Sequence, residues 1–110
     1  MNWRQLTSLS QLQEIKELSE QQPVAIFKHS TRCSISSMAK NRLESEWHFS
    51  DENLPIYYLD LLNCRDVSAQ IATDFDVYHA SPQIVVIKNG KSIYDNSHMG
   101  ISVADIVKSI

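Results

Sequence analysis

The residues best suited to chemistry lie between Lys28 and Ser36, where Cys33 is surrounded by polar side chains. An apolar run at residues 24–27 precedes them with the composition of a β-strand. Residues 35–47 follow with apolar side chains at helical spacing. Cys33 therefore stands at a predicted strand-to-helix junction, where the first backbone N–H groups of the helix lack partners. These groups and the helix dipole favour a thiolate over a thiol, so Cys33 is a candidate nucleophile.

The neighbours of Cys33 are of types that could stabilise a thiolate. Arg32 adds a cation, and the hydroxyls of Thr31, Ser34 and Ser36 are close enough in sequence to donate hydrogen bonds to the sulfur. A free cysteine is more commonly a small buried apolar residue than a nucleophile. The polar flanks, however, predict a sulfur near solvent, and we expect the rest of the chain to present it.

Length and composition restrict the class of protein. A chain of 110 residues with 43% hydrophobic residues is expected to form one domain, residues 1–110, with its own core. A net charge of −3 and scattered basic residues argue against nucleic acid as a partner. No stretch approaches the ~18 apolar residues of a membrane span, and the N-terminus has no apolar signal region. We therefore expect a cytoplasmic protein without a membrane partner.

Hydrophobic periodicity predicts four helices. The first begins at a capping box formed by Ser10 and Gln13, and it ends before Pro23. The second spans residues 34–48, the third spans 64–75 with Asn63 as its cap, and the last follows Ser102. The residues expected to face the core are Leu9, Leu12, Ile15 and Leu18, then Ile35, Met38, Ala39, Leu43 and Trp47, then Val67, Ile71, Ala72 and Phe75, and finally Val103, Ile106, Val107 and Ile110.

Four strands are predicted between these helices. They span residues 24–29, 56–62, 83–88 and 91–94, and the last two are joined by an Asn89-Gly90 hairpin. Residues 3–6 are either a short edge strand or an ordered arm. Strands joined through a helix are parallel and right-handed. The sequence therefore predicts an α/β fold with a four-stranded mixed sheet and helices on both faces.

This order of elements, with a cysteine after the first core strand and Ser81-Pro82 before the hairpin, resembles a thioredoxin-like fold. Residues 29–36, 57–60, 81–83 and 87–90 are similar to those of the monothiol bacilliredoxins, thioredoxin-like proteins of the bacillithiol system. The resemblance implies that Cys33 is the attacking thiolate. It also implies that Ser36 replaces the resolving cysteine of dithiol relatives, and that Ser81 and a cis Pro82 pair with the thiol ligand.

Two positions depart from the pattern of thioredoxins that reduce protein disulfides. Those proteins tend to carry a buried acidic residue six positions before the cysteine and a tryptophan immediately before it, whereas this chain has Phe27 and Arg32. A second cysteine is also missing from the motif. General disulfide reductase activity is therefore not expected.

The function that the resemblance implies is removal of a small thiol, bacillithiol, from S-thiolated proteins, with the small thiol as co-substrate and no bound cofactor. Two alternatives stay open on the residues alone. One is a glutaredoxin-type enzyme that uses glutathione, because no residue distinguishes the two thiols. The other is a non-catalytic binding module in which Ser81-Pro82 holds an extended peptide.

A second cysteine and four histidines are further candidates for chemistry. Cys64 follows the strand at 56–62, at the sheet edge where Cys33 emerges, so it either resolves a Cys33 adduct or is incidental. The four histidines have no metal-site spacing, and one cysteine per motif is too few for structural zinc. We expect no metal, with an iron–sulfur cluster bridged between two subunits as the open alternative.

Overall fold

The computed structural model describes residues 1–110. Its elements in chain order are β1 (Trp3–Gln5), α1 (Leu9–Leu18), β2 (Val24–His29), α2 (Ser34–Glu46), β3 (Ile56–Asp60), α3 (Arg65–Phe75), β4 (Gln83–Lys88), β5 (Lys91–Ser97), the 3₁₀ helix η1 (His98–Gly100) and α4 (Val103–Ser109).

The strands form one mixed sheet in the order β1-β3-β2-β4-β5. β1 and β2 both run parallel to β3, whereas β4 is antiparallel to β2 and to β5. The sheet therefore has five strands, and the prediction of four is wrong. The added strand is the edge strand at residues 3–5, where Trp3 pairs with Ile56. Three residues are too few to carry a periodic signal, but the Trp3 ring packs against Phe27 and Tyr58.

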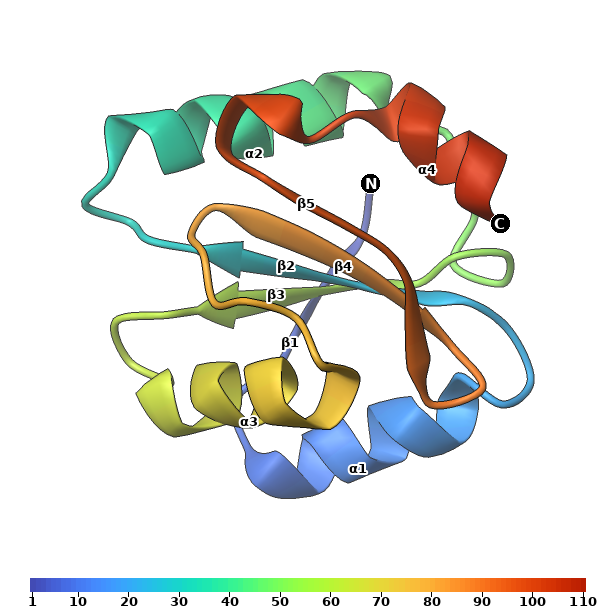
Figure 1. Ribbon diagram of the computed structural model, residues 1–110. Coiled ribbons are helices and arrows are strands. Elements are labelled where there is room, and N and C mark those ends of the chain that lie inside the picture. The colour runs from blue at the N-terminus through green and yellow to red at the C-terminus, as the bar shows by residue number, and fades with distance from the viewer.

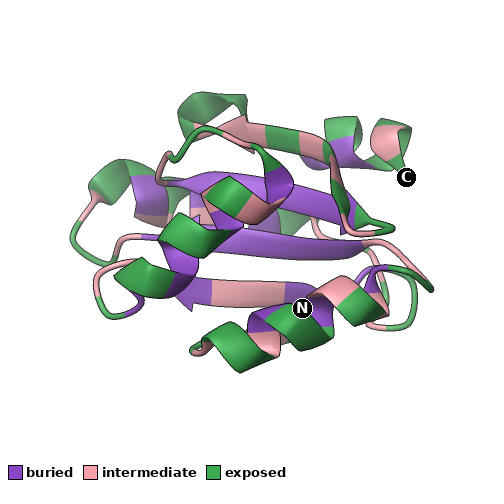
Figure 2. Cartoon of the chain, turned by 60° about the horizontal axis from the view of Figure 1, so that its bottom comes forward, coloured by how far each residue is buried: buried purple, intermediate pink, exposed green.

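Helices cover both faces of the sheet, as predicted. Figure 1 shows α1 and α3 on one face and α2 and α4 on the other. Each pair encloses its own core, and the central strands between them are almost wholly buried (Figure 2). The larger core under α1 and α3 includes Leu6, Leu12, Ile15, Val24, Ile26, Leu59, Val67, Ile71, Phe75, Val85 and Ile87.

Strand β2 is the centre of the sheet, and all six of its residues are buried, as expected. Its side chains alternate between the two cores: Val24 and Ile26 face α1 and α3, while Ala25 and Phe27 face α2 and α4. The last two positions, Lys28 and His29, continue this alternation with polar groups. The two faces of the sheet therefore each receive a buried basic side chain immediately before the Cys33 loop.

Helix α1 begins two residues earlier than its predicted capping box. The N-cap is Ser8, whose hydroxyl accepts a hydrogen bond from the Gln11 backbone N–H. The Gln11 side chain in turn accepts from the backbone N–H of Thr7. Ser10 therefore lies within the helix, and Leu9 is exposed instead of facing the core.

Helix α2 differs most from the expected pattern. Its inward face consists of Ser36, Ala39 and Leu43, whereas Ile35 and Met38 are 43% and 57% exposed. The helix begins after a loop that carries the chain past the end of β2, so its first turn extends beyond the end of that strand (Figure 1). Periodicity alone does not reveal that extension. Trp47, also expected inside, lies half-buried just after the helix.

The remaining helices and strands match the prediction apart from their ends. The cap of α3 is Cys64, because the side chain of Asn63 donates to the Asp60 carboxylate instead. Ser102 caps α4 by accepting from the Asp105 N–H, as expected. β3 ends at residue 60 and β5 continues to residue 97. Three residues expected in the core are only half-buried or exposed: Ala72, Val107 and Ile110.

The predicted Asn89-Gly90 hairpin is confirmed. Both residues have positive φ angles, 54° at Asn89 and 74° at Gly90, which is the backbone that a tight two-residue hairpin requires. This turn lies at the end of β4 opposite Pro82, and therefore far along the strand from the Cys33 loop.

Candidate active site

Cys33 is the N-cap residue of α2, a helix of 13 residues. Its backbone is extended, its N–H donates to the Ser30 carbonyl at 3.1 Å, and its carbonyl accepts from the Ser37 N–H at 3.1 Å. The residue is half-buried, while Thr31, Arg32 and Ser34 around it are exposed. Its side chain makes no capping hydrogen bond. The sulfur therefore lies at the unpaired N–H groups of the first helical turn, and it accepts a hydrogen bond from none of them.

Ser36, three residues after Cys33, is wholly buried and holds the loop together. Its Oγ lies 2.7 Å from His29 Nδ1 and accepts a hydrogen bond from the Ser30 N–H at 3.0 Å. The sequence predicts that the Ser36 hydroxyl bonds to the Cys33 sulfur, but its partners are His29 and Ser30. Ser36 thus joins the end of β2 to the first turn of α2, and the loop that carries Cys33 is closed by this contact.

The His29 side chain lies in a largely aromatic environment beneath that loop. Its ring stacks on Phe27 at 5.8 Å between centroids and lies 5.5 Å from the ring of Tyr58. Burial is the main cause that lowers the pKa of His29, and the nearby Lys40 cation lowers it further. The imidazole is therefore neutral at neutral pH, so the loop next to Cys33 is supported by an uncharged group.

Ser81 and Pro82 lie at the same end of the central strands as the Cys33 loop. Antiparallel pairing of Lys28 with Gln83 places Pro82 next to His29 in the register. The Ser81–Pro82 bond is cis. Pro82 is buried, and its carbonyl accepts from the His98 N–H at 3.0 Å. The Ser81 hydroxyl is buried without a hydrogen-bond partner, a condition that native proteins mostly avoid.

Lys28 forms a second polar cluster on the opposite face of β2. Its Nζ is fully buried and donates to the Ser68 carbonyl at 3.0 Å and to His79 Nδ1 at 3.3 Å. An ammonium group has only donors, so His79 Nδ1 accepts and the ring proton lies on Nε2. Burial lowers the pKa of Lys28 to about 8. This cluster ties the loop before Pro82 to the strand before Cys33.

The sequence alone does not identify these two supporting clusters. The signal for Lys28 is present but weak: it is a charged residue at a position where the alternation of β2 calls for an apolar one. His79 and Ser68 are unremarkable in sequence, and they reach Lys28 across 51 and 40 positions of the chain. Contacts at such separation follow from the sheet topology and not from any local pattern.

Cys64 is not arranged as a nucleophile. It is buried, and its Sγ lies 4.0 Å from the Thr7 carbonyl. Burial, followed by the carboxylates of Asp60 and Asp66, raises the pKa of the Cys64 thiol. A protonated, buried thiol attacks disulfides slowly, which favours the interpretation of Cys64 as incidental.

Neither a metal centre nor a membrane segment is visible in the chain. No three His, Cys, Asp or Glu side chains gather closely enough to hold a metal ion. None of the helices combines the length and the apolar character needed to cross a membrane.

Fold and site together define a thioredoxin-fold protein with one cysteine at the start of the helix after its central strand. Residues 4–106 match the family described as monothiol bacilliredoxin BrxC, and the chain belongs to this family. A solved structure described as an oxidoreductase with a thioredoxin fold is similar over 97% of this chain and 92% of its own, with 28% identity and a TM-score of 0.83. Family and fold support a thiol redox function.

More distant solved structures agree on the fold alone. Thioredoxin from Malassezia sympodialis has a TM-score of 0.75 at 15% identity and covers 99% of this chain and 90% of its own. Thioredoxin from Fasciola hepatica has a TM-score of 0.74 at 16% identity and covers 97% and 95%. The predicted thioredoxin-like fold is therefore confirmed.

Proposed function

We propose that this protein removes a low-molecular-weight thiol, bacillithiol, from mixed disulfides on other proteins, with the thiolate of Cys33 as nucleophile. The observation that carries the proposal is the contrast between the two cysteines. Cys33 lies half-exposed at the N-terminus of a 13-residue helix, whereas Cys64 is buried and held as a thiol. Membership of the bacilliredoxin family supports bacillithiol as the cap.

The reaction consists of two exchanges. The Cys33 thiolate attacks the sulfur of the cap, a Cys33–cap disulfide forms, and the old disulfide bond breaks to release the target's sulfur as a thiolate. A second small-thiol thiolate then attacks the cap sulfur and releases Cys33. The cap and the second small thiol leave as their symmetrical disulfide, so one disulfide bond replaces another, and the second small thiol is oxidised as the target's sulfur is reduced.

Ser36 explains why a small thiol completes the cycle. A thioredoxin with a second cysteine at this position can resolve its own adduct, but a serine hydroxyl cannot form a disulfide. Ser36 is moreover buried against His29 and Ser30. Thr31, Arg32 and Ser34 are the exposed groups beside the sulfur, and in this proposal they contact the cap.

Ser81 and Pro82 complete the proposed site at the neighbouring loop, where backbone groups pair with the bound thiol. The substrates are S-thiolated proteins and the co-substrate is the small thiol. Such a cycle requires a compartment that keeps small thiols reduced, for which we propose the cytoplasm.

The decisive experiment offers one target protein capped either with bacillithiol or with glutathione. Release of the target's thiol is followed with the wild type, Cys33→Ser and the matched control Cys64→Ser. We expect the bacillithiol cap to be removed faster, with Cys64→Ser as active as the wild type and Cys33→Ser inactive. Equal removal of both caps would contradict the choice of thiol, and removal by Cys33→Ser would contradict the nucleophile.

A further inference from the structure

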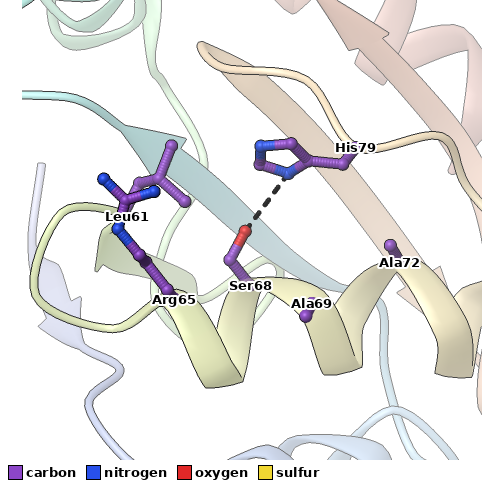
Figure 3. A pocket seen from close by; sticks show the side chains of 6 residues that line it. All are labelled: Leu61, Arg65, Ser68, Ala69, Ala72 and His79. Atoms are coloured by element: carbon purple, nitrogen blue, oxygen red, sulfur yellow. Dashed lines mark hydrogen bonds between the residues drawn. The ribbon is translucent and has the colours of Figure 1, made fainter.

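A cleft between α3 and the loop before Pro82 has no role in the exchange chemistry described above. Its volume is about 310 Å³, and it is lined by Leu61, Arg65, Ser68, Ala69, Ala72 and His79. Figure 3 shows the His79 ring reaching from the loop across α3, with the Arg65 and Leu61 side chains at the far end. Small-molecule sites begin at about 300 Å³, so the cleft has room for part of a small ligand.

Arg65 joins this cleft to a second one beside the nucleophile. The second cleft has a volume of about 380 Å³ and is lined by Thr31, Arg32, Asp60, Leu62, Asn63 and Arg65. Thr31 and Arg32 immediately precede Cys33 in the chain. Arg65 lines both clefts, and the second cleft is formed in part by the two residues that precede the nucleophile.

The positive charges that line these two clefts outnumber the negative ones. The structure contains two ion pairs, Lys16–Asp74 and Lys40–Glu44, and neither includes a residue that lines the clefts. Asp60 is the one carboxylate among the lining residues, and it already accepts hydrogen bonds from the Leu62 N–H and the Asn63 amide. Arg32 and Arg65 are thus without an anionic partner in a chain whose net charge is −3.

The buried ammonium of Lys28 lies behind the first cleft. Both of its acceptors, the Ser68 carbonyl and His79 Nδ1, belong to lining residues and are neutral. A buried cation without a carboxylate is costly, and a ligand anion in the cleft would offset part of that cost. Lys28 also holds the His79 proton on Nε2, so the ring offers a donor on its other side.

We propose that the two clefts joined by Arg65 bind the part of the small thiol beyond its sulfur, and that this part carries a carboxylate held by Arg65. The guanidinium binds a carboxylate with two parallel hydrogen bonds, and His79 Nε2–H is a further donor at the same cleft. This inference rests on the proposed function and adds to it a specificity-determining residue, Arg65, that selects small thiols by their negative charge.

The test compares two aromatic disulfide reagents that differ in charge, dithiobis(nitrobenzoate), a dianion, and dithiodipyridine, which is neutral at pH 7. In each reaction the Cys33 thiolate attacks one sulfur, a new disulfide forms, and the aromatic thiolate leaves with a change in absorbance. The proteins all carry Cys64→Ser so that Cys33 is the one reacting thiol. Arg65→Gln is compared with Lys91→Gln, an exposed cation at the distant hairpin.

We expect Arg65→Gln to lower the rate with the anionic reagent three- to tenfold, roughly the range for a partly exposed charge-assisted pair. The rate with the neutral reagent should not change, and Lys91→Gln should match the parent with both. The preference for the anion should also shrink as salt is added. Equal losses with both reagents, or no loss with either, would overturn the assignment of Arg65. Failure of Cys33 to react with either reagent would instead contradict the proposed function itself.

Discussion

The buried lysine Lys28 allows a prediction about stability that can be worked out in numbers. Its ammonium group is fully buried, and its acceptors, the Ser68 carbonyl and His79 Nδ1, are both neutral. Burial lowers its pKa from 10.5 to about 8. Because one pKa unit corresponds to about 1.4 kcal/mol, the folded state disfavours the charged lysine by about 3 kcal/mol relative to the unfolded chain.

The sign of the effect follows from proton binding. Below a pH of about 8 both states carry the proton, and the folded protein bears the whole cost. Between about 8 and 10.5 the unfolded chain binds more protons than the folded one, so stability rises with pH in this window. Replacement by methionine removes the charge but loses two hydrogen bonds, worth about 1 kcal/mol each. We therefore expect Lys28→Met to raise the free energy of unfolding at pH 7 by about 1 kcal/mol.

Urea unfolding followed by circular dichroism, repeated from pH 7 to pH 10, measures this effect. The advantage of Lys28→Met over the wild type should be constant up to a pH of about 8 and then decline by up to ~1.4 kcal/mol per pH unit. The matched control Lys91→Met, at an exposed position, should show no pH-dependent difference. A Lys28→Met protein that is less stable at pH 7, by an amount independent of pH, would refute the reasoning.

Three further predictions concern the loop, the hairpin and acid pH. Ser36→Ala should lower the free energy of unfolding by about 1–3 kcal/mol in urea, because it removes the partner of His29 Nδ1 and of the Ser30 N–H; an unchanged midpoint would mean that the contact is dispensable. Gly90→Ala should cost about 1 kcal/mol in the same assay through backbone strain alone, since φ is +74° and no atom lies within 4 Å of the added Cβ. A neutral effect would show that the turn relaxes. Because the folded protein holds His29 neutral and the unfolded chain binds a proton below a pH of about 6.5, stability should fall on acidification below that pH. His29→Gln should flatten part of this fall, and an identical pH profile in the variant would count against it.

The central elements of the fold could be predicted because their signals are local. Strand β2 begins with four apolar residues in succession, the Asn89-Gly90 pair specifies its own turn, and Ser102 caps the helix that follows it directly. The outward position of Ile35 and Met38 could not be predicted, since their spacing suits an inward face. Their exposure depends on where α2 begins relative to the end of β2, which is a property of the tertiary structure.

The site, like the fold, has one part that local sequence signals predict and another that depends on tertiary contacts. The position of Cys33 at a helix start could be predicted from the strand before it and the helix after it. The contacts that support it could not, because Ser36 reaches back to His29, and Lys28 reaches His79 across the sheet. Arg65 belongs to the site through a cleft shared between the start of α3 and the loop at Thr31, which no sequence spacing indicates.

The most direct test of the proposed function is a single-turnover measurement by intact-protein mass spectrometry. A bacillithiol-capped target is mixed with this protein in the absence of free thiol, and both masses are followed. We predict that the wild type gains the mass of one cap at Cys33 while the target loses it, and that Cys33→Ser gains nothing. Loss of the cap from the target without a cap on Cys33, or transfer to Cys64, would contradict the assignment of Cys33 as the nucleophile.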